Sequence, residues 1–121
     1  MKICQFINTE IGFDFIISYA YGDLEDIKSI ILQRTPEFEF ALYPEERGVH
    51  FSSEDETDKD EYNDELNMLK EVMITGREVR LIGSKYNIEI DCFNVDEDEW
   101  KESLVVFKKM NFDDVFKFTV K

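Results

Sequence analysis

The residues best placed to do chemistry in this 121-residue chain are carboxylates gathered near its middle. They are Glu54, Asp55, Glu56, Asp58, Asp60, Glu61, Asp64 and Glu65, interrupted by a single lysine, Lys59, and a single aromatic residue, Tyr62. Carboxylates this close together repel one another and resist burial, so we predict a solvated loop at about 53–65. Such a loop either keeps the protein soluble or presents negative charge to a basic partner, with Tyr62 as an aromatic anchor.

Carboxylates also bind calcium and catalyse glycoside hydrolysis, but the spacing here favours neither chemistry. An EF-hand loop needs a glycine five residues after its first aspartate, and neither Asp55 nor Asp58 is followed by one. Glycoside hydrolysis needs two carboxylates held in a cleft with unequal pKa values, which a self-repelling run does not provide. We therefore expect no metal, no cofactor and no catalytic carboxylate.

The residues used in nucleophilic catalysis are equally sparse. His50 is the only histidine, so this chain alone cannot build a Ser-His-Asp, Cys-His or multi-histidine site, and we expect a structural strand residue. Cys4 and Cys92 lie in separate apolar stretches and are predicted to be buried, reduced thiols. The five glycines stand singly and form no phosphate-binding loop. The sequence therefore predicts a protein that is not an enzyme.

Charge and composition narrow the class of partner. The formal net charge is -14 and the sequence pI is about 4.4, which argues against binding nucleic acid or an anionic membrane through phosphate contacts. The hydrophobic fraction of 43% is enough for one packed domain spanning residues 1–121. No stretch approaches the about 18 consecutive apolar residues of a membrane span. We expect a cytoplasmic protein with a basic protein partner.

The negative charge is concentrated in one part of the chain. Residues 45–65 contain ten acidic and two basic residues, whereas residues 101–121 contain five lysines and three carboxylates. If the neighbouring turn lies at the same end of the domain, the acidic surface is extended by further residues. These are Tyr43, Glu45, Glu46 and His50.

Most of the remaining chain has the pattern of strands. We predict strands over 3–7, 13–21, 49–52, 66–74, 78–82 and 86–91, with Gly76 supplying a positive φ in the connection between 66–74 and 78–82. Residues 27–35 fit either a helix or a strand, and the short distance to Pro36 favours a strand. The alternation of Phe38, Phe40 and Leu42 predicts that the extended conformation continues after Pro36.

One helix is predicted, from about Glu97 to Met110. Asp96 is a favourable N-cap, and Glu99 stands at the capping-box position. An apolar face suited to covering a sheet is formed by Trp100, Leu104, Val106, Phe107 and Met110. A final alternating segment over 115–120 adds an edge strand or lies over the core. The predicted fold is α+β, with a mostly antiparallel sheet of about six to eight strands and one C-terminal helix packed on one face.

Several of these features resemble the immunity protein ten family of bacterial polymorphic-toxin systems over roughly residues 27–112. They are Ile31-Leu32-Gln33-Arg34, the hairpin around Gly76, the alternating Ile88-Glu89-Ile90-Asp91 and the acid-capped helix that starts at Asp96. The family's middle region is rich in glycine and aromatic residues, whereas this chain has the acidic run there. The resemblance implies a small cytoplasmic protein that binds and neutralises a cognate toxin domain, often a basic nuclease.

Three functional hypotheses follow from the sequence, and the least favoured is a small enzyme or ligand-binding domain with a pocket between sheet and helix. In the first, an immunity protein binds a basic toxin domain through Glu54, Asp55, Glu56, Asp58, Asp60, Glu61, Tyr62, Asp64 and Glu65, whose carboxylates imitate nucleic-acid phosphates. In the second, the protein is a non-catalytic interaction or structural module of the cytoplasm. Its sheet edge or helix face then makes the contact, and the acidic loop serves only solubility.

Overall fold

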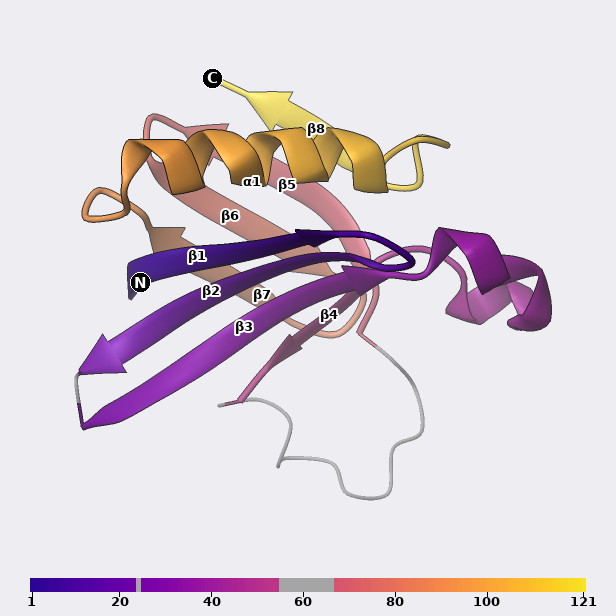
Figure 1. Cartoon of the computed structure of the whole chain (residues 1–121), viewed down its shortest axis with the longest axis horizontal. Coiled ribbons are helices and arrows are strands. Elements are labelled where there is room, and N and C mark those ends of the chain that lie inside the picture. The colour runs from indigo at the N-terminus through magenta and orange to yellow at the C-terminus, as the bar shows by residue number, and fades with distance from the viewer. Residues whose placement is uncertain (24, 55–66) are drawn as a thin grey trace.

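The computed structural model describes residues 1–23, 25–54 and 67–121, which form a twisted sheet with one helix across one face (Figure 1). The strands are β1 (Lys2–Ile11), β2 (Phe15–Asp23), β3 (Asp26–Arg34), β4 (His50–Ser53), β5 (Leu69–Thr75), β6 (Glu78–Gly83), β7 (Asn87–Asp91) and β8 (Lys117–Val120). The helix is α1 (Glu97–Met110), and two short 3-10 helices, η1 (Pro36–Ala41) and η2 (Pro44–Glu46), lie between β3 and β4. The predicted α+β class is confirmed.

The eight strands follow the order β4-β3-β2-β1-β7-β6-β5-β8. Neighbouring strands are antiparallel except at two places, where β1 pairs with β7 and β5 pairs with β8 in parallel. The β1–β7 pairing is short, joining Lys2 to Ile90 and Ile3 to Asp91. The N-terminal strand thus lies at the centre of the sheet and connects the β1–β4 half to the β5–β8 half.

The two halves also approach each other at the β4 side. His50 and Met68 form an isolated antiparallel bridge between β4 and the chain just before β5. The Phe51 amide donates to the Asn67 carbonyl at 2.9 Å. The Leu69 amide donates to the Val49 carbonyl, also at 2.9 Å. The sheet therefore curls far enough to bring β4 into hydrogen-bonding contact with the start of β5.

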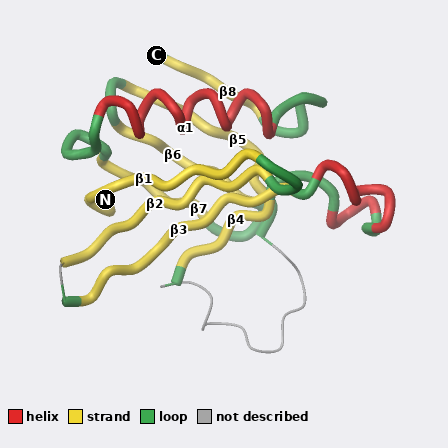
Figure 2. The backbone as a smooth tube through the Cα atoms, viewed as in Figure 1, coloured by secondary structure: helices red, strands yellow, loops and turns green. Residues whose placement is uncertain are grey.

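The core lies between the inner face of the sheet and α1 (Figure 2). Alternate residues of β2 and β3 point inward, so that Ile17, Tyr19, Ile30 and Leu32 are fully buried. The helix contributes its predicted apolar face, of which Trp100, Val106, Phe107 and Met110 are buried and Leu104 is partly buried. The predicted role of this stripe as core is confirmed.

The structure resolves the ambiguity over 27–35 and corrects the end of the first strand. Residues 27–34 lie in β3, which agrees with the strand that the short distance to Pro36 favoured. The first strand does not end at Ile7 but continues through Asn8 to Ile11, because residues 6–11 keep their antiparallel pairing with β2. The last segment forms the edge strand β8, paired with β5.

The extended conformation predicted for Phe38, Phe40 and Leu42 is wrong for the two phenylalanines, whereas Leu42, just after the helix, is extended. Residues 36–41 form η1, with Pro36 at its N-terminal position and Glu37 and Glu39 in its first turn. Proline is favoured at the start of a helix because its φ is already helical and its missing amide needs no partner there. Acidic side chains in the first turn are likewise favoured by the helix dipole. Phe38 and Phe40 consequently face solvent.

The predicted capping box of α1 is also wrong in one of its two residues. The Asp96 carboxylate caps the helix as expected, accepting from the Asp98 amide at 3.1 Å. The Glu99 carboxylate instead accepts a 2.7 Å hydrogen bond from the amide of Ile7 in β1. The register of β1 against β2 shifts between Cys4 and Phe6, just before this contact. Glu99 therefore fastens the helix to the central strand.

Candidate interaction surface

Of the residues predicted to bind a partner, the structure describes only Glu54. The others, Asp55, Glu56, Asp58, Asp60, Glu61, Tyr62, Asp64 and Glu65, lie outside the described residues. Glu54 is exposed and continues the pairing of β4 with β3. Its amide donates to the Ser29 carbonyl at 3.2 Å, and its carboxylate accepts from the Ser29 amide at 3.1 Å.

The described residues on either side of the acidic run belong to the same region of the sheet. β4 ends at Ser53, and the chain re-enters the described structure at Asn67, whose carbonyl accepts from the Phe51 amide. The Asn67 side chain also accepts from the Lys85 amide at 2.8 Å. The chain segment that carries the other carboxylates therefore begins and ends at one region of the sheet.

The turn before β4 lies beside this region. His50 bridges to Met68, and its Nε2 is 3.0 Å from the Glu46 carbonyl, so this histidine has the structural role that was predicted. The Glu46 carboxylate accepts from the Tyr43 amide at 3.4 Å, and the Tyr43 ring is exposed. The structure thus brings Tyr43, Glu46 and His50 together, as expected if the turn extends the acidic surface.

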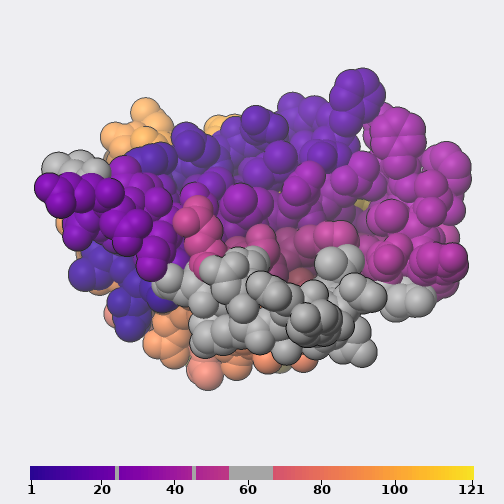
Figure 3. Space-filling view, turned by 90° about the horizontal axis from the view of Figure 1, so that it is seen from below, coloured from indigo at the N-terminus to yellow at the C-terminus, as the bar shows by residue number. Residues whose placement is uncertain are grey.

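A second surface was not predicted from the sequence. Of the seven exposed aromatic side chains among the described residues, five belong to three segments that meet at one end of the sheet. We call this surface the aromatic end; it consists of Phe13, Phe38, Phe40, Tyr43 and Phe112, which are between 53% and 79% exposed. In Figure 3 the indigo β1–β2 turn projects beside the magenta η1–η2 segment. Clusters of exposed apolar side chains of this kind mark sites of interaction.

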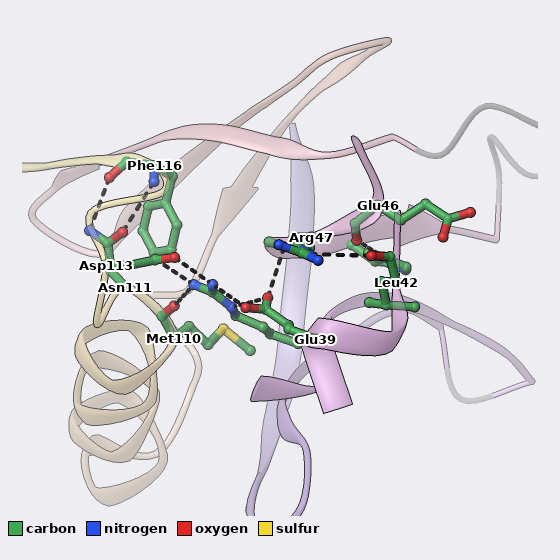
Figure 4. Close-up of polar contacts among 11 residues, drawn as sticks. Glu39, Leu42, Glu46, Arg47, Met110, Asn111, Asp113 and Phe116 are labelled. Atoms are coloured by element: carbon green, nitrogen blue, oxygen red, sulfur yellow. Dashed lines mark hydrogen bonds and ion pairs between the residues drawn. The ribbon is translucent and has the colours of Figure 1, made fainter. Parts of the chain in front are cut away.

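Two segments of the aromatic end, η1 and the chain after α1, are held together by Arg34, the last residue of β3. Its side chain is only 1% exposed and forms ion pairs with Glu39 of η1 at 2.8 Å and with Asp113 after α1 at 2.7 Å. Each carboxylate receives two hydrogen bonds from the guanidinium, and a further one, of 2.6 Å, goes to the Met110 carbonyl (Figure 4). Together these hydrogen bonds use all five N–H groups of the guanidinium, as a buried arginine requires.

The neighbours of Arg34 complete this connection. The Phe112 ring lies over the guanidinium, 4.0 Å from its central carbon, and Glu39 also accepts from the Gly48 amide at 3.0 Å. Burial by itself would lower the pKa of Arg34, but the hydrogen bonds to Asp113 and Glu39 outweigh it and raise the pKa. The hydrogen bond from Arg34 in turn lowers the pKa of Asp113. The ion pairs of Arg34 with Glu39 and Asp113 fix η1 against the end of α1.

The two cysteines are buried and free, as the sequence predicted. Hydrogen bonding to Cys4 and burial raise the pKa of Cys92, and burial raises the pKa of the neighbouring Tyr19 hydroxyl. Within residues 1–23, 25–54 and 67–121, no three His, Cys, Asp or Glu side chains gather closely enough to hold a metal ion. None of the helices in those ranges is long and apolar enough to cross a membrane.

Sequence reasoning missed the aromatic end for two reasons. Arg34 follows Ile30 and Leu32 at the spacing of inward-facing strand residues, so its burial could have been inferred, but its partner Asp113 lies 79 residues away. Phe38 was assigned to the wrong type of element. No protein-family model, curated protein or solved structure matches this chain, so the surface is defined by its own residues.

Proposed function

We propose that this chain is a non-catalytic immunity protein that acts in the bacterial cytoplasm by binding and neutralising a basic toxin domain. The observation that carries the proposal is the concentration of negative charge, with ten acidic and two basic residues in 45–65 of a chain whose net charge is -14. A cleft that binds nucleic-acid phosphates is lined with cations, and a dense set of carboxylates offers it comparable negative charge.

The described structure supports this proposal through the attachment of the acidic residues. The segment that carries them starts after Glu54, which is hydrogen-bonded to β3, and ends at Asn67, which is hydrogen-bonded to β4. Glu46 lies next to β4, where its carbonyl contacts His50, and its carboxylate accepts from the Tyr43 amide. Long-range attraction between this charge and a cationic domain accelerates association and weakens with added salt.

The test asks first whether a neighbouring gene encodes a basic toxin domain, and then expresses that domain under separate control in a bacterial host. Co-expression of the full chain is expected to restore growth, and the two purified proteins are expected to form a stoichiometric complex. The dissociation constant should rise steeply between about 0.05 M and 0.5 M salt, because the Debye length falls several-fold over that range.

The control is a variant in which the eight carboxylates of residues 54–65 are replaced by Asn and Gln. It should lose protection while keeping the melting temperature of the parent protein within a few degrees. Full protection by this variant would show that the carboxylates serve only solubility. A tight complex whose affinity does not depend on salt would instead favour the interaction module, with the contact made by the sheet edge or the helix face.

A further inference from the structure

Two shallow hollows open at the aromatic end. One has a volume of about 490 Å³ and is lined by residues 10–14 in the β1–β2 turn. The other has a volume of about 440 Å³ and is lined by Phe15, Pro36, Glu37, Lys109 and Phe112. Because Asp14 lines the first hollow and the next residue, Phe15, lines the second, the two are neighbours. Their linings differ in chemistry.

The first hollow combines two carboxylates with an aromatic ring. In the part of the chain that the structure describes, neither Glu10 nor Asp14 forms an ion pair, and the Phe13 ring is 70% exposed. The Asp14 carboxylate accepts a 2.7 Å hydrogen bond from Gln33, which is neutral and leaves the charge uncompensated. Carboxylates beside an aromatic face are the groups that bind a guanidinium or an ammonium ion.

The second hollow is mainly apolar. Phe15, Pro36 and Phe112 supply its apolar lining, and the single charges of Glu37 and Lys109 balance each other. The Phe112 ring is positioned by its contact with Arg34, and Pro36 starts the helix whose Glu39 is bound to the same guanidinium. The walls of this hollow are therefore held in place before any partner arrives, which lowers the entropic cost of binding.

We propose that the aromatic end is a docking site for a cationic protein, with an arginine or lysine side chain in the first hollow and a bulky apolar side chain in the second. This inference rests on the proposed function, because it adds a second contact surface for the same basic toxin domain. It differs in location, since the described residues that line the two hollows lie in the β1–β2 turn, at the start of β2 and η1, and around the end of α1.

Charge selects this occupant over the alternatives. Among the described residues, those that line the two hollows include three carboxylates and one lysine, so this lining is net negative, like the chain as a whole. A second copy of this chain carries the same net charge of -14 and is repelled at long range. Anionic lipid is repelled for the same reason. A cationic protein surface with exposed apolar residues is attracted to both hollows.

The test is a nuclear magnetic resonance titration of the isotope-labelled full chain with capped dipeptides. The capped Arg-Leu dipeptide is the probe, and capped Glu-Leu and Arg-Gly are the controls. Arg-Leu is expected to shift the amide signals of Gly12 and Phe13 together with those of Glu37 and Phe112. Arg-Gly should shift only the first pair, and Glu-Leu should bind more weakly than either. Equal shifts from Glu-Leu, or shifts confined to other surfaces, would overturn the proposal.

Matched variants locate the binding. Phe13→Ser should weaken Arg-Leu binding roughly two- to fivefold, as expected for loss of an exposed cation–π contact. Phe93→Ser is the control, because Phe93 is 67% exposed and lies before α1, at the opposite end of the helix. Glu10→Gln should reduce the salt dependence of binding, whereas Glu102→Gln on the exposed side of α1 should not. Equal effects of Phe13→Ser and Phe93→Ser would contradict the assigned site.

The two proposals fail in different ways. The variant with residues 54–65 neutralised should still bind Arg-Leu at the aromatic end, because no carboxylate of the hollows is changed. If that variant loses protection and the parent chain does not bind Arg-Leu, the docking site is wrong and the immunity function stands. If Arg-Leu binds as expected but the chain gives no protection against the toxin domain, the immunity function is wrong.

Two further measurements test the other possible occupants of the aromatic end. They are binding to vesicles of anionic lipid and sedimentation of the free chain. Membrane binding or dimerisation that is lost in Phe13→Ser would assign the surface to another occupant.

Discussion

The guanidinium of Arg34 and the carboxylate of Asp113 meet at 2.7 Å although 79 residues separate them in the chain. One residue ends a strand, and the other follows the helix that covers the sheet. With Glu39, this pair joins β3, η1 and the chain after α1. The geometry of the aromatic end therefore depends on a single buried cation.

Replacing that cation should destabilise the whole domain. Arg34→Met is expected to lower the free energy of unfolding by about 3 kcal/mol, because it leaves Glu39 and the Met110 carbonyl without their donor. Chemical denaturation measures the change. The control is Arg80→Met, whose partner Glu89 lies 3.8 Å away on the exposed side of the sheet. That substitution should cost less than about 1 kcal/mol, and equal losses would show that burial of Arg34 contributes little.

The Asp113 carboxylate should make stability depend on pH. Arg34 holds the pKa of Asp113 below its unfolded value, so the ion pair stabilises the protein fully above that unfolded value, about 3.9. The stabilisation is lost as the pH falls through the lower folded-state pKa. Since Asp113 is 45% exposed, Asp113→Asn should cost about 1 kcal/mol at neutral pH. The difference from the parent protein should shrink toward about pH 2.

The control for this experiment is the adjacent carboxylate. Asp114 has a φ of 55°, a conformation that asparagine also adopts, so Asp114→Asn changes the charge without straining the backbone. Because Asp114→Asn leaves the ion pair between Arg34 and Asp113 intact, this variant should lose stability with falling pH in the same way as the parent protein. A constant difference between Asp113→Asn and the parent protein over the whole pH range would contradict the ion-pair explanation.

The contact between Glu99 and Ile7 should govern how firmly α1 is held to β1. Glu99→Ala removes the acceptor of the partly buried Ile7 amide and should cost about 2 kcal/mol, whereas Glu99→Gln keeps an oxygen there and should cost less. Hydrogen exchange of the Ile7 amide reports the contact directly and should accelerate in Glu99→Ala. Glu102→Ala, on the exposed side of the helix, should leave that amide unaffected.

The buried hydroxyl of Tyr19 should be dispensable. Among the described residues it has no hydrogen-bond partner, and burial raises its pKa so that it stays neutral. Tyr19→Phe removes a desolvated polar group and should leave stability unchanged or raise it by up to about 1 kcal/mol. Tyr21→Phe should instead be destabilising, since the Tyr21 hydroxyl lies 3.3 Å from that of Ser53. Thermal unfolding followed by circular dichroism distinguishes the two signs.

Local patterns were sufficient for most of the elements. Trp100 and Phe107 recur at the helical period in α1, and Ile30 and Leu32 alternate with less buried neighbours in β3. In α1 the period, the N-cap and the burial agree, whereas in β3 the spacing also fitted a helix and the short distance to Pro36 favoured the strand. The α+β class follows from those elements without knowledge of their partners.

The same reasoning failed where two local signals disagreed. Phe38 and Phe40 alternate like strand residues, but Pro36 and the acidic residues after it favour a helical start, and the aromatic rings are not needed in the core. Contacts between residues that are far apart in the sequence, such as Arg34 and Asp113, could not be predicted from local patterns either. The residues proposed to bind a toxin were chosen for their charge, with Tyr62 as an aromatic anchor, and the structure describes only Glu54 among them.

The central position of β1 has a consequence for how the protein is made. The first strand leaves the ribosome early, and the two strands after it can pair with it in turn. Its other edge has no neighbour until β7 has been synthesised, because Lys2 pairs with Ile90. During that interval one edge of a nascent apolar strand is open to strands from other chains. The surplus of carboxylates makes such chains repel one another, so the acidity of the sequence also protects the protein during its synthesis.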